Sequence, residues 1–171
     1  MVTPTPNTLH RRKWVTGALL VVYAAVVLTA TMWPTPIDRG RSASIGSFLD
    51  RLHGWGLPGW FDYSTLEASA NVAMFVPLAL LLTLLLPTRA WWVVLLACPF
   101  LSVTIELTQL AVLPARFATI SDVIANSTGA VIGVAAALVL RGALRLNARR
   151  RIAARARATG PRFRVRVREP V

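Results

Sequence analysis

Six polar side chains lie within or next to stretches of this sequence that are otherwise strongly apolar. They comprise three carboxamides, two carboxylates and one guanidinium: Asn71, Glu106, Gln109, Arg116, Asp122 and Asn126. Such groups could bind a charged or hydrogen-bonding ligand, and Glu106 or Asp122 could act as a general acid or base. An ionisable side chain at the centre of a membrane costs roughly 2.5 to 3.5 kcal/mol on insertion scales, so each one requires a reason.

Histidine chemistry and metal binding have little support in the sequence. The two histidines, His10 and His53, lie outside the stretches that carry the six polar residues, whereas phosphatases that act on lipid phosphates need a positioned histidine nucleophile. A carboxylate metal site built from Glu67, Glu106 and Asp122 stays open, although their spacing matches no ligand motif. We therefore predict no metal and no other cofactor.

The elements that must position these residues are four long apolar stretches. Each has about the 20 residues needed to cross a hydrocarbon layer ~30 Å thick, where only a helix satisfies its own backbone groups. The predicted helices cover about residues 15–33, 66–86, 90–113 and 122–140. Charged residues make up 15% of the chain, below the roughly one quarter that is typical of soluble domains. The sequence predicts an all-α, polytopic membrane protein with a bundle of about four transmembrane helices.

Helical spacing places the polar residues of each predicted helix on one face. At 100° per residue, Ser102, Glu106 and Gln109 fall within about 60° of one another. Glu67 and Asn71 share a face near the start of the second predicted helix. These positions predict that the polar groups of separate helices meet at one end of the bundle.

The fourth predicted helix combines a polar start with small residues deeper in the span. Asp122 and Asn126 share a face with Gly129 and Gly133, whose GxxxG spacing allows two helices to approach closely. Ser121 or Asp122 is expected to cap the N-terminus of this helix.

The distribution of Lys and Arg predicts the orientation in the membrane. With the N-terminus inside, the cytoplasmic segments carry 15 of the 19 basic residues, and the outer segments, 34–65 and 114–121, carry four. Both termini would then be cytoplasmic. A basic leader at residues 1–14 and an Arg-rich tail at residues 141–171 would flank a membrane domain at residues 15–140.

The tail and the first outer segment each suggest a contact with lipid. Eleven of the 19 basic residues lie from Arg141 onward, and Arg141, Arg145 and Arg149 are spaced as in a continuing helix. Basic residues near a membrane gain about 1 kcal/mol each from anionic lipid, which favours inner-leaflet lipid over nucleic acid as the partner. The outer segment has aromatic residues suited to the headgroup region, or alternatively to stacking on a substrate: Phe48, Trp55, Trp60, Phe61 and Tyr63.

Arg116 is the cation expected to pair with Glu106 or Asp122, because it lies in the short segment between the last two predicted helices. Two interpretations of the six residues stay open. They could form a buried network that only holds helices together, or an outward-facing pocket for a polar headgroup.

The same residues resemble a known family. Residues 71–78 resemble the Asn-x-x-x-Phe-x-Pro-Leu-Gly segment of the VanZ-like, or teicoplanin-resistance, family, and residues 101–109 resemble its Leu-Ser-x-x-x-Glu-x-x-Gln segment. Arg116 and residues 121–133 resemble its third block. The chain departs from the family at Ala79 and Thr128, which stand where Gly and Leu are commoner; both changes are small.

The resemblance implies a four-helix membrane protein of the bacterial cell envelope and, for the founding member, lowered susceptibility to teicoplanin. It supplies no established catalytic residue. Three functions stay open: a non-enzymatic protein that binds a lipid headgroup, a lipid-linked wall precursor or a lipophilic glycopeptide; a membrane-embedded enzyme acting on an envelope lipid; and a small proton-coupled transporter. Four helices are few for a pore, so a transporter would have to form a homo-oligomer.

Overall fold

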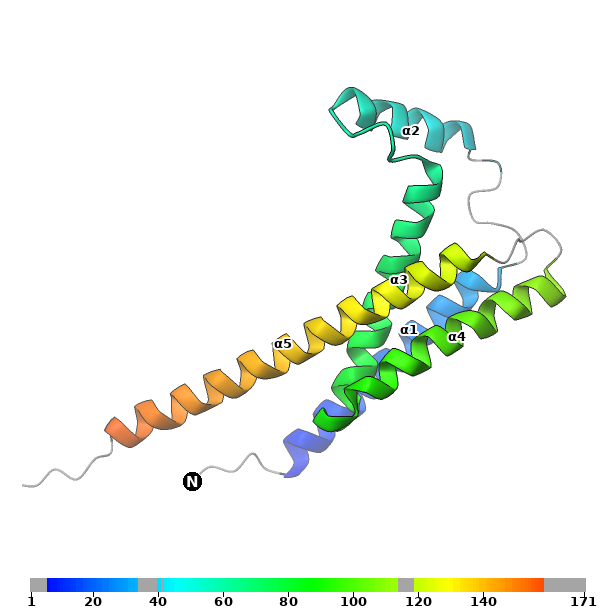
Figure 1. Cartoon of the computed structure of the whole chain (residues 1–171). Coiled ribbons are helices and arrows are strands. Elements are labelled where there is room, and N and C mark those ends of the chain that lie inside the picture. Colours follow the sequence, from blue (N-terminus) through cyan, green and yellow to red (C-terminus); the bar gives the residue numbers. More distant parts are fainter. Residues whose placement is uncertain (1–5, 34–39, 41, 114–118, 159–171) are drawn as a thin grey trace, which may run out of the picture. The chain divides into compact units, whose positions relative to one another are not determined.

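The computed structural model describes residues 6–33, 40, 42–113 and 119–158, and these are mostly helical (Figure 1). The helices, in chain order, are α1 Pro6–Thr31, α2 Ser42–Gly54, α3 Tyr63–Leu85, the 3-10 turn η1 Thr88–Ala90, α4 Trp91–Val112 and α5 Ile120–Ala158. The described residues fall into two compact units, one ending at Leu138 and the other beginning at Val139, so that α5 belongs to both.

Four segments are long and apolar enough to cross a membrane: His10–Thr31, Tyr63–Leu85, Thr88–Val112 and Ile120–Ala154. The predicted all-α, polytopic architecture is therefore confirmed. Two helices are longer than their apolar stretches, because a helix can continue with polar residues where its backbone is no longer in hydrocarbon. α1 already begins at Pro6, and α5 continues through the arginines to Ala158.

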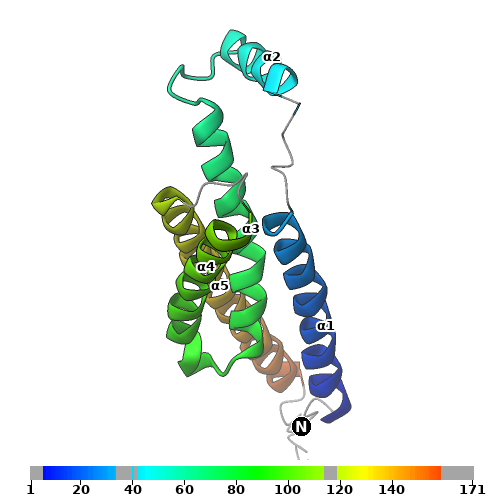
Figure 2. The same cartoon turned by 90° about the vertical axis from the view of Figure 1, so that its right-hand side faces the viewer.

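The segment between the first two spans contains a helix that the sequence analysis did not predict. α2 covers Ser42–Gly54, and Figures 1 and 2 both show it next to the N-terminal end of α3. Its inward side carries Ile45, Leu49 and Leu52 at helical spacing, and Leu49 is only 7% exposed. Three apolar residues on one short face suffice to pack a helix, but they give a much weaker sequence signal than a membrane span.

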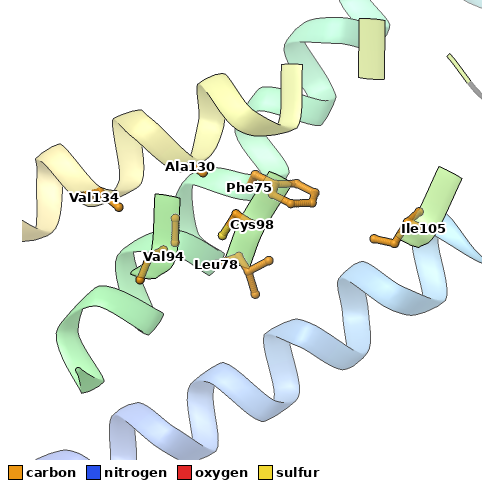
Figure 3. Packing of buried hydrophobic residues seen from close by; sticks show 8 residues of the cluster. Phe75, Leu78, Val94, Cys98, Ile105, Ala130 and Val134 are labelled. Carbon is orange, nitrogen blue, oxygen red and sulfur yellow. The ribbon is translucent and has the colours of Figure 1, made fainter. Parts of the chain in front are cut away.

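The core lies between α3, α4 and α5 (Figure 3). It is built from Phe75, Leu78, Ala79, Val94, Cys98, Ile105, Ala130 and Val134. α1 packs against this core through Leu20, Tyr23 and Ala24, and the Tyr23 hydroxyl donates to the Met74 carbonyl oxygen at 2.9 Å. Large apolar side chains such as Val21 and Phe100 point away from the core, at 70% and 75% exposure, as expected for surfaces that contact lipid tails.

Gly129 and Gly133 bring α5 into backbone contact with α3. A Cβ atom at residue 129 would meet the carbonyl oxygen of Val72 and would lie 2.9 Å from the Phe75 Cβ. At Gly133 the same addition would meet the carbonyl oxygen of Val76. The GxxxG spacing therefore acts as the sequence predicted, since only glycine leaves room for the facing backbone.

Asp62 caps the N-terminus of α3 with a fully exposed carboxylate. Its Oδ1 accepts hydrogen bonds from the Ser64 hydroxyl at 2.7 Å, the Thr65 backbone N–H at 2.9 Å and the Thr65 hydroxyl at 3.0 Å. These bonds, that from Ser64 foremost, lower the pKa of Asp62 from 3.8 to about 2. They favour the charged form in the folded protein.

We expect Asp62→Ala to lower the thermal unfolding temperature in detergent above pH ~4, because the start of α3 loses its cap. Since the folded-state pKa lies below the unfolded-state value, the carboxylate's contribution is present above the unfolded pKa and disappears as the pH falls through about 2. The two proteins should therefore converge at acid pH. Asp62→Asn is the matched control, because it can cap but does not titrate. A difference between wild type and Asp62→Ala that does not change with pH would contradict this account.

Candidate functional site

The close contact between α3 and α5 brings together the polar residues near the N-terminal ends of these two helices. Asn71 lies one residue before Val72, whose carbonyl faces Gly129, and Asp122 lies two turns before that glycine. The Asn71 Nδ2 donates to the Asp122 Oδ1 at 2.6 Å. A hydrogen bond to a carboxylate is shorter and stronger than one between neutral groups, so this contact links the two helices firmly.

Thr119 caps the N-terminus of α5. Its Oγ1 accepts from the Asp122 backbone N–H at 3.2 Å and donates to the Asp122 Oδ2 at 2.8 Å. The expectation that Ser121 or Asp122 would cap this helix is wrong, because the helix begins earlier, at Ile120. Thr119 and Asp122 are spaced as in a capping box, in which the acidic residue reaches back toward the cap.

Glu106 connects α4 to the same helix start. Its Oε2 accepts from the Thr119 backbone N–H at 2.9 Å, and the side chain is 8% exposed. A helix N-terminus carries a partial positive charge and unpaired N–H groups, which stabilise a nearby carboxylate. Glu106 and Asp122, on different helices, are therefore both bonded to Thr119.

A second contact between α4 and α5 lies one helical turn deeper. The Asn126 Nδ2 donates to the Ser102 Oγ at 2.8 Å, and these residues are 3% and 0% exposed. The Asn126 Oδ1 has no hydrogen-bond partner in the part of the chain that the structure describes. A buried amide with one half unbonded is uncommon, because leaving such a group unsatisfied costs about 1–3 kcal/mol.

Gln109 links α4 to the end of α1. Its Nε2 donates to the Thr31 carbonyl oxygen at 2.7 Å, and the side chain is 5% exposed. The last carbonyl groups of a helix have no partner within it, so Gln109 closes the C-terminal end of α1. Gln109 therefore bonds to α1, whereas the other polar groups bond to one another among α3, α4 and the start of α5.

The structure thus brings together Asn71, Glu106 and Asp122 through Thr119, with Asn126 one turn below. We call Asn71, Ser102, Glu106, Thr119, Asp122 and Asn126 the polar cluster. Gln109 lies on the same face of α4 but bonds to α1. Arg116 lies outside the described residues, so its pairing with Glu106 or Asp122 stays a prediction.

Thr119 is the member of the cluster that the sequence analysis missed, although the Thr-x-x-Asp spacing before α5 is a recognisable capping signal. Among the residues that the structure describes, no group of three or more His, Cys, Asp and Glu side chains is placed to hold a metal ion. The cluster instead offers carboxylate and carboxamide groups to a hydrogen-bonding partner.

Comparison with known proteins identifies the family. A family model described as VanZ/LLP1 matches residues 20–141, a range that includes the whole polar cluster and all six polar positions of the sequence analysis. Searches of curated proteins and of solved structures gave no match. The match covers most of the chain and all four membrane-spanning helices in whole or in part, and on this evidence the chain belongs to the VanZ/LLP1 family.

Proposed function

We propose that this protein lies in the bacterial cell membrane and that its polar cluster binds the polar headgroup of an envelope lipid or of a lipid-linked wall precursor. Binding of this kind would lower susceptibility to teicoplanin-type lipophilic glycopeptides. The observation that carries the proposal is the buried Asn126 amide, one half of which has no described partner, beside two carboxylates at one end of an apolar bundle.

The unbonded half of Asn126 distinguishes the cluster from a completed packing network. The Ser102 hydroxyl is the one described partner of this amide. The Oδ1 atom of the same amide is buried and accepts no hydrogen bond from the residues that the structure describes. A polar group of a ligand, or a water molecule, is needed to complete it.

The depth of the cluster suits a lipid headgroup. Glu106 lies six residues before the end of α4 at Val112, which is about 9 Å along the helix at 1.5 Å per residue. The headgroup layers add roughly 5–7 Å to each side of a ~30 Å hydrocarbon core. A headgroup that enters between the helix ends could therefore reach Glu106 by moving only a short distance below the headgroup layer.

The lipid that co-purifies with detergent-extracted protein tests this proposal. We expect wild type to retain one headgroup class above its membrane abundance, and Asn126→Leu, which has the same branched shape without hydrogen-bonding groups, to lose that enrichment. Thr104→Val is the matched control, because Thr104 is exposed on α4 and its hydroxyl bonds to the Phe100 carbonyl oxygen of its own helix. Equal lipid profiles in all three proteins, measured by mass spectrometry, would contradict a headgroup site.

We also propose that the arginines at the end of α5 bind anionic lipid. Arg149, Arg150 and Arg151 are exposed on the helix, and basic side chains near a membrane surface attract anionic headgroups. Changing all three to Gln should reduce the anionic lipid that co-purifies while sparing the lipid that depends on Asn126. Unchanged anionic lipid in this variant would refute the contact.

The predicted orientation would put the polar cluster in the outer leaflet, and cysteine labelling tests this prediction. We expect an impermeant maleimide added to intact cells to modify Ala118→Cys and to spare Arg150→Cys, each in a Cys98→Ser background. The reason is the excess of basic residues on the predicted cytoplasmic side, 15 against four. The reverse labelling pattern would move the cluster to the inner leaflet.

A further inference from the structure

The segment Ser42–Phe61, formed by α2 and the turn after it, is ordered and exposes large aromatic side chains that the polar cluster does not use. We propose that this segment is a peripheral anchor that lies in the headgroup layer of the bilayer, on the membrane side where the polar cluster lies. Phe48, Trp55 and Trp60 would be the side chains that enter the lipid. The proposal does not depend on what the cluster binds.

The aromatic side chains are exposed on a structured segment. Phe48, Trp55 and Trp60 are 51%, 84% and 71% exposed. Phe48 lies on α2, and Trp55 lies in the turn directly after the last residue of that helix, Gly54. Tryptophan rings favour the membrane interface, because they combine a large apolar surface with one N–H group.

Hydrogen bonds and packing fix the turn that holds the tryptophans outward. The His53 Nε2 lies 3.0 Å from the Phe61 carbonyl oxygen, which can only accept, so the ring nitrogen donates. The Leu57 N–H donates to the Leu52 carbonyl oxygen at 3.0 Å, across Gly56 with its φ of +100°. The side of α2 that carries Leu49, about 100° around the helix from Phe48, is buried. The exposed rings are therefore held in a defined position.

The distance of this segment from the polar cluster supports a position near the membrane surface. Asn71 lies eight residues after the start of α3 and Glu106 six residues before the end of α4, which correspond to about 12 Å and 9 Å. Since Asn71 and Glu106 are linked through Asp122 and Thr119, these two helix ends lie at similar distances along their helices from the polar cluster. The last turn of α4 still exposes apolar side chains, Val112 at 65%. The apolar surface of α4 therefore extends about as far along its helix from the polar cluster as the start of α3, next to which the anchor segment lies.

Charge favours a lipid interface over a charged partner. The anchor segment contains one Asp and one Arg, Asp50 and Arg51, so that it carries no net charge when His53 is neutral. Its attraction to the bilayer would come from apolar area and would not require anionic lipid. An acidic glycan or nucleic acid would instead require a basic surface.

Tryptophan fluorescence of the full-length protein in vesicles tests the anchor. Two variants keep Trp55 or Trp60 and change the other five of the six tryptophans to Phe. We expect blue-shifted emission and a loss of intensity that is strongest with lipids brominated near the carbonyl end of the acyl chain. The result should be equal in zwitterionic vesicles and in vesicles containing phosphatidylglycerol. Emission typical of indole in water, with quenching by iodide and none by brominated lipid, would overturn the proposal.

A second measurement covers the case in which removal of five tryptophans prevents folding. Trp55→Cys and Trp60→Cys can be spin-labelled in the otherwise native chain, because Cys98 is 1% exposed and wild type serves as the unlabelled control. We expect labels at both positions to be more accessible to oxygen than to a water-soluble nickel complex. The opposite preference at both positions would refute the anchor. It would say nothing about the lipid retention that depends on Asn126, so the two proposals can fail separately.

Discussion

Gly129→Ala combined with Gly133→Ala should strongly destabilise the bundle, although each change adds only one methyl group. The added Cβ atoms would meet the carbonyl oxygens of Val72 and Val76 on α3. A backbone atom cannot move aside by changing a rotamer, so α3 and α5 would have to separate. Overpacking typically costs about 1–3 kcal/mol per site, and we expect both positions to lie near the upper value.

The matched control for this prediction is Gly142→Ala, in the same helix. A Cβ at residue 142 has no heavy atom within 4 Å, so alanine there should leave the protein as stable as wild type or more stable, by up to ~1 kcal/mol. Thermal unfolding in one detergent compares the variants. Similar unfolding temperatures for the Gly129/Gly133 double variant and the Gly142→Ala control would show that α3 and α5 are not in backbone contact.

The sequence predicted the spans and the faces of the helices better than it predicted the contacts between them. Long apolar stretches identify membrane helices because the bilayer imposes a minimum length, and helical phase correctly placed Asn71 and Asp122 at the same end of the bundle. Phase does not specify which neighbouring helix a face meets. The pairing of Ser102 with Asn126, and of Asn71 with Asp122, therefore emerged only from the structure.

Contacts to the backbone were the least predictable part of the candidate site. Gln109 lies on the same face as Glu106, yet it donates to the Thr31 carbonyl oxygen of α1. A backbone carbonyl is present at every residue, so that partner leaves no signal in the sequence. The bond from the Thr119 N–H to Glu106 depends likewise on where α5 begins, and an apolar pattern locates the start of a helix only to within a few residues.

Glu106→Gln and Arg116→Gln should each destabilise the protein when introduced alone. Gln keeps the shape of Glu106 and can still accept from the Thr119 N–H, but it removes the charge that is predicted to balance Arg116. A buried charge without its partner costs about 3–5 kcal/mol. Each single variant therefore measures the loss of stability when one charge is removed, and neither can by itself separate a packing network from a ligand site.

The most direct test of the central claim, that the polar cluster is a headgroup site, is the double variant Glu106→Gln with Arg116→Gln. Removing both charges should restore most of the thermal stability in detergent that the single changes lose. Retention of the enriched lipid is measured on the purified double variant. The susceptibility to a lipophilic glycopeptide is measured on cells that express it. We predict a stable protein that retains no enriched lipid and gives no protection, because the charges that anchor the headgroup are gone. Recovery of stability, lipid retention and protection together would contradict the account and would reduce the cluster to helix packing.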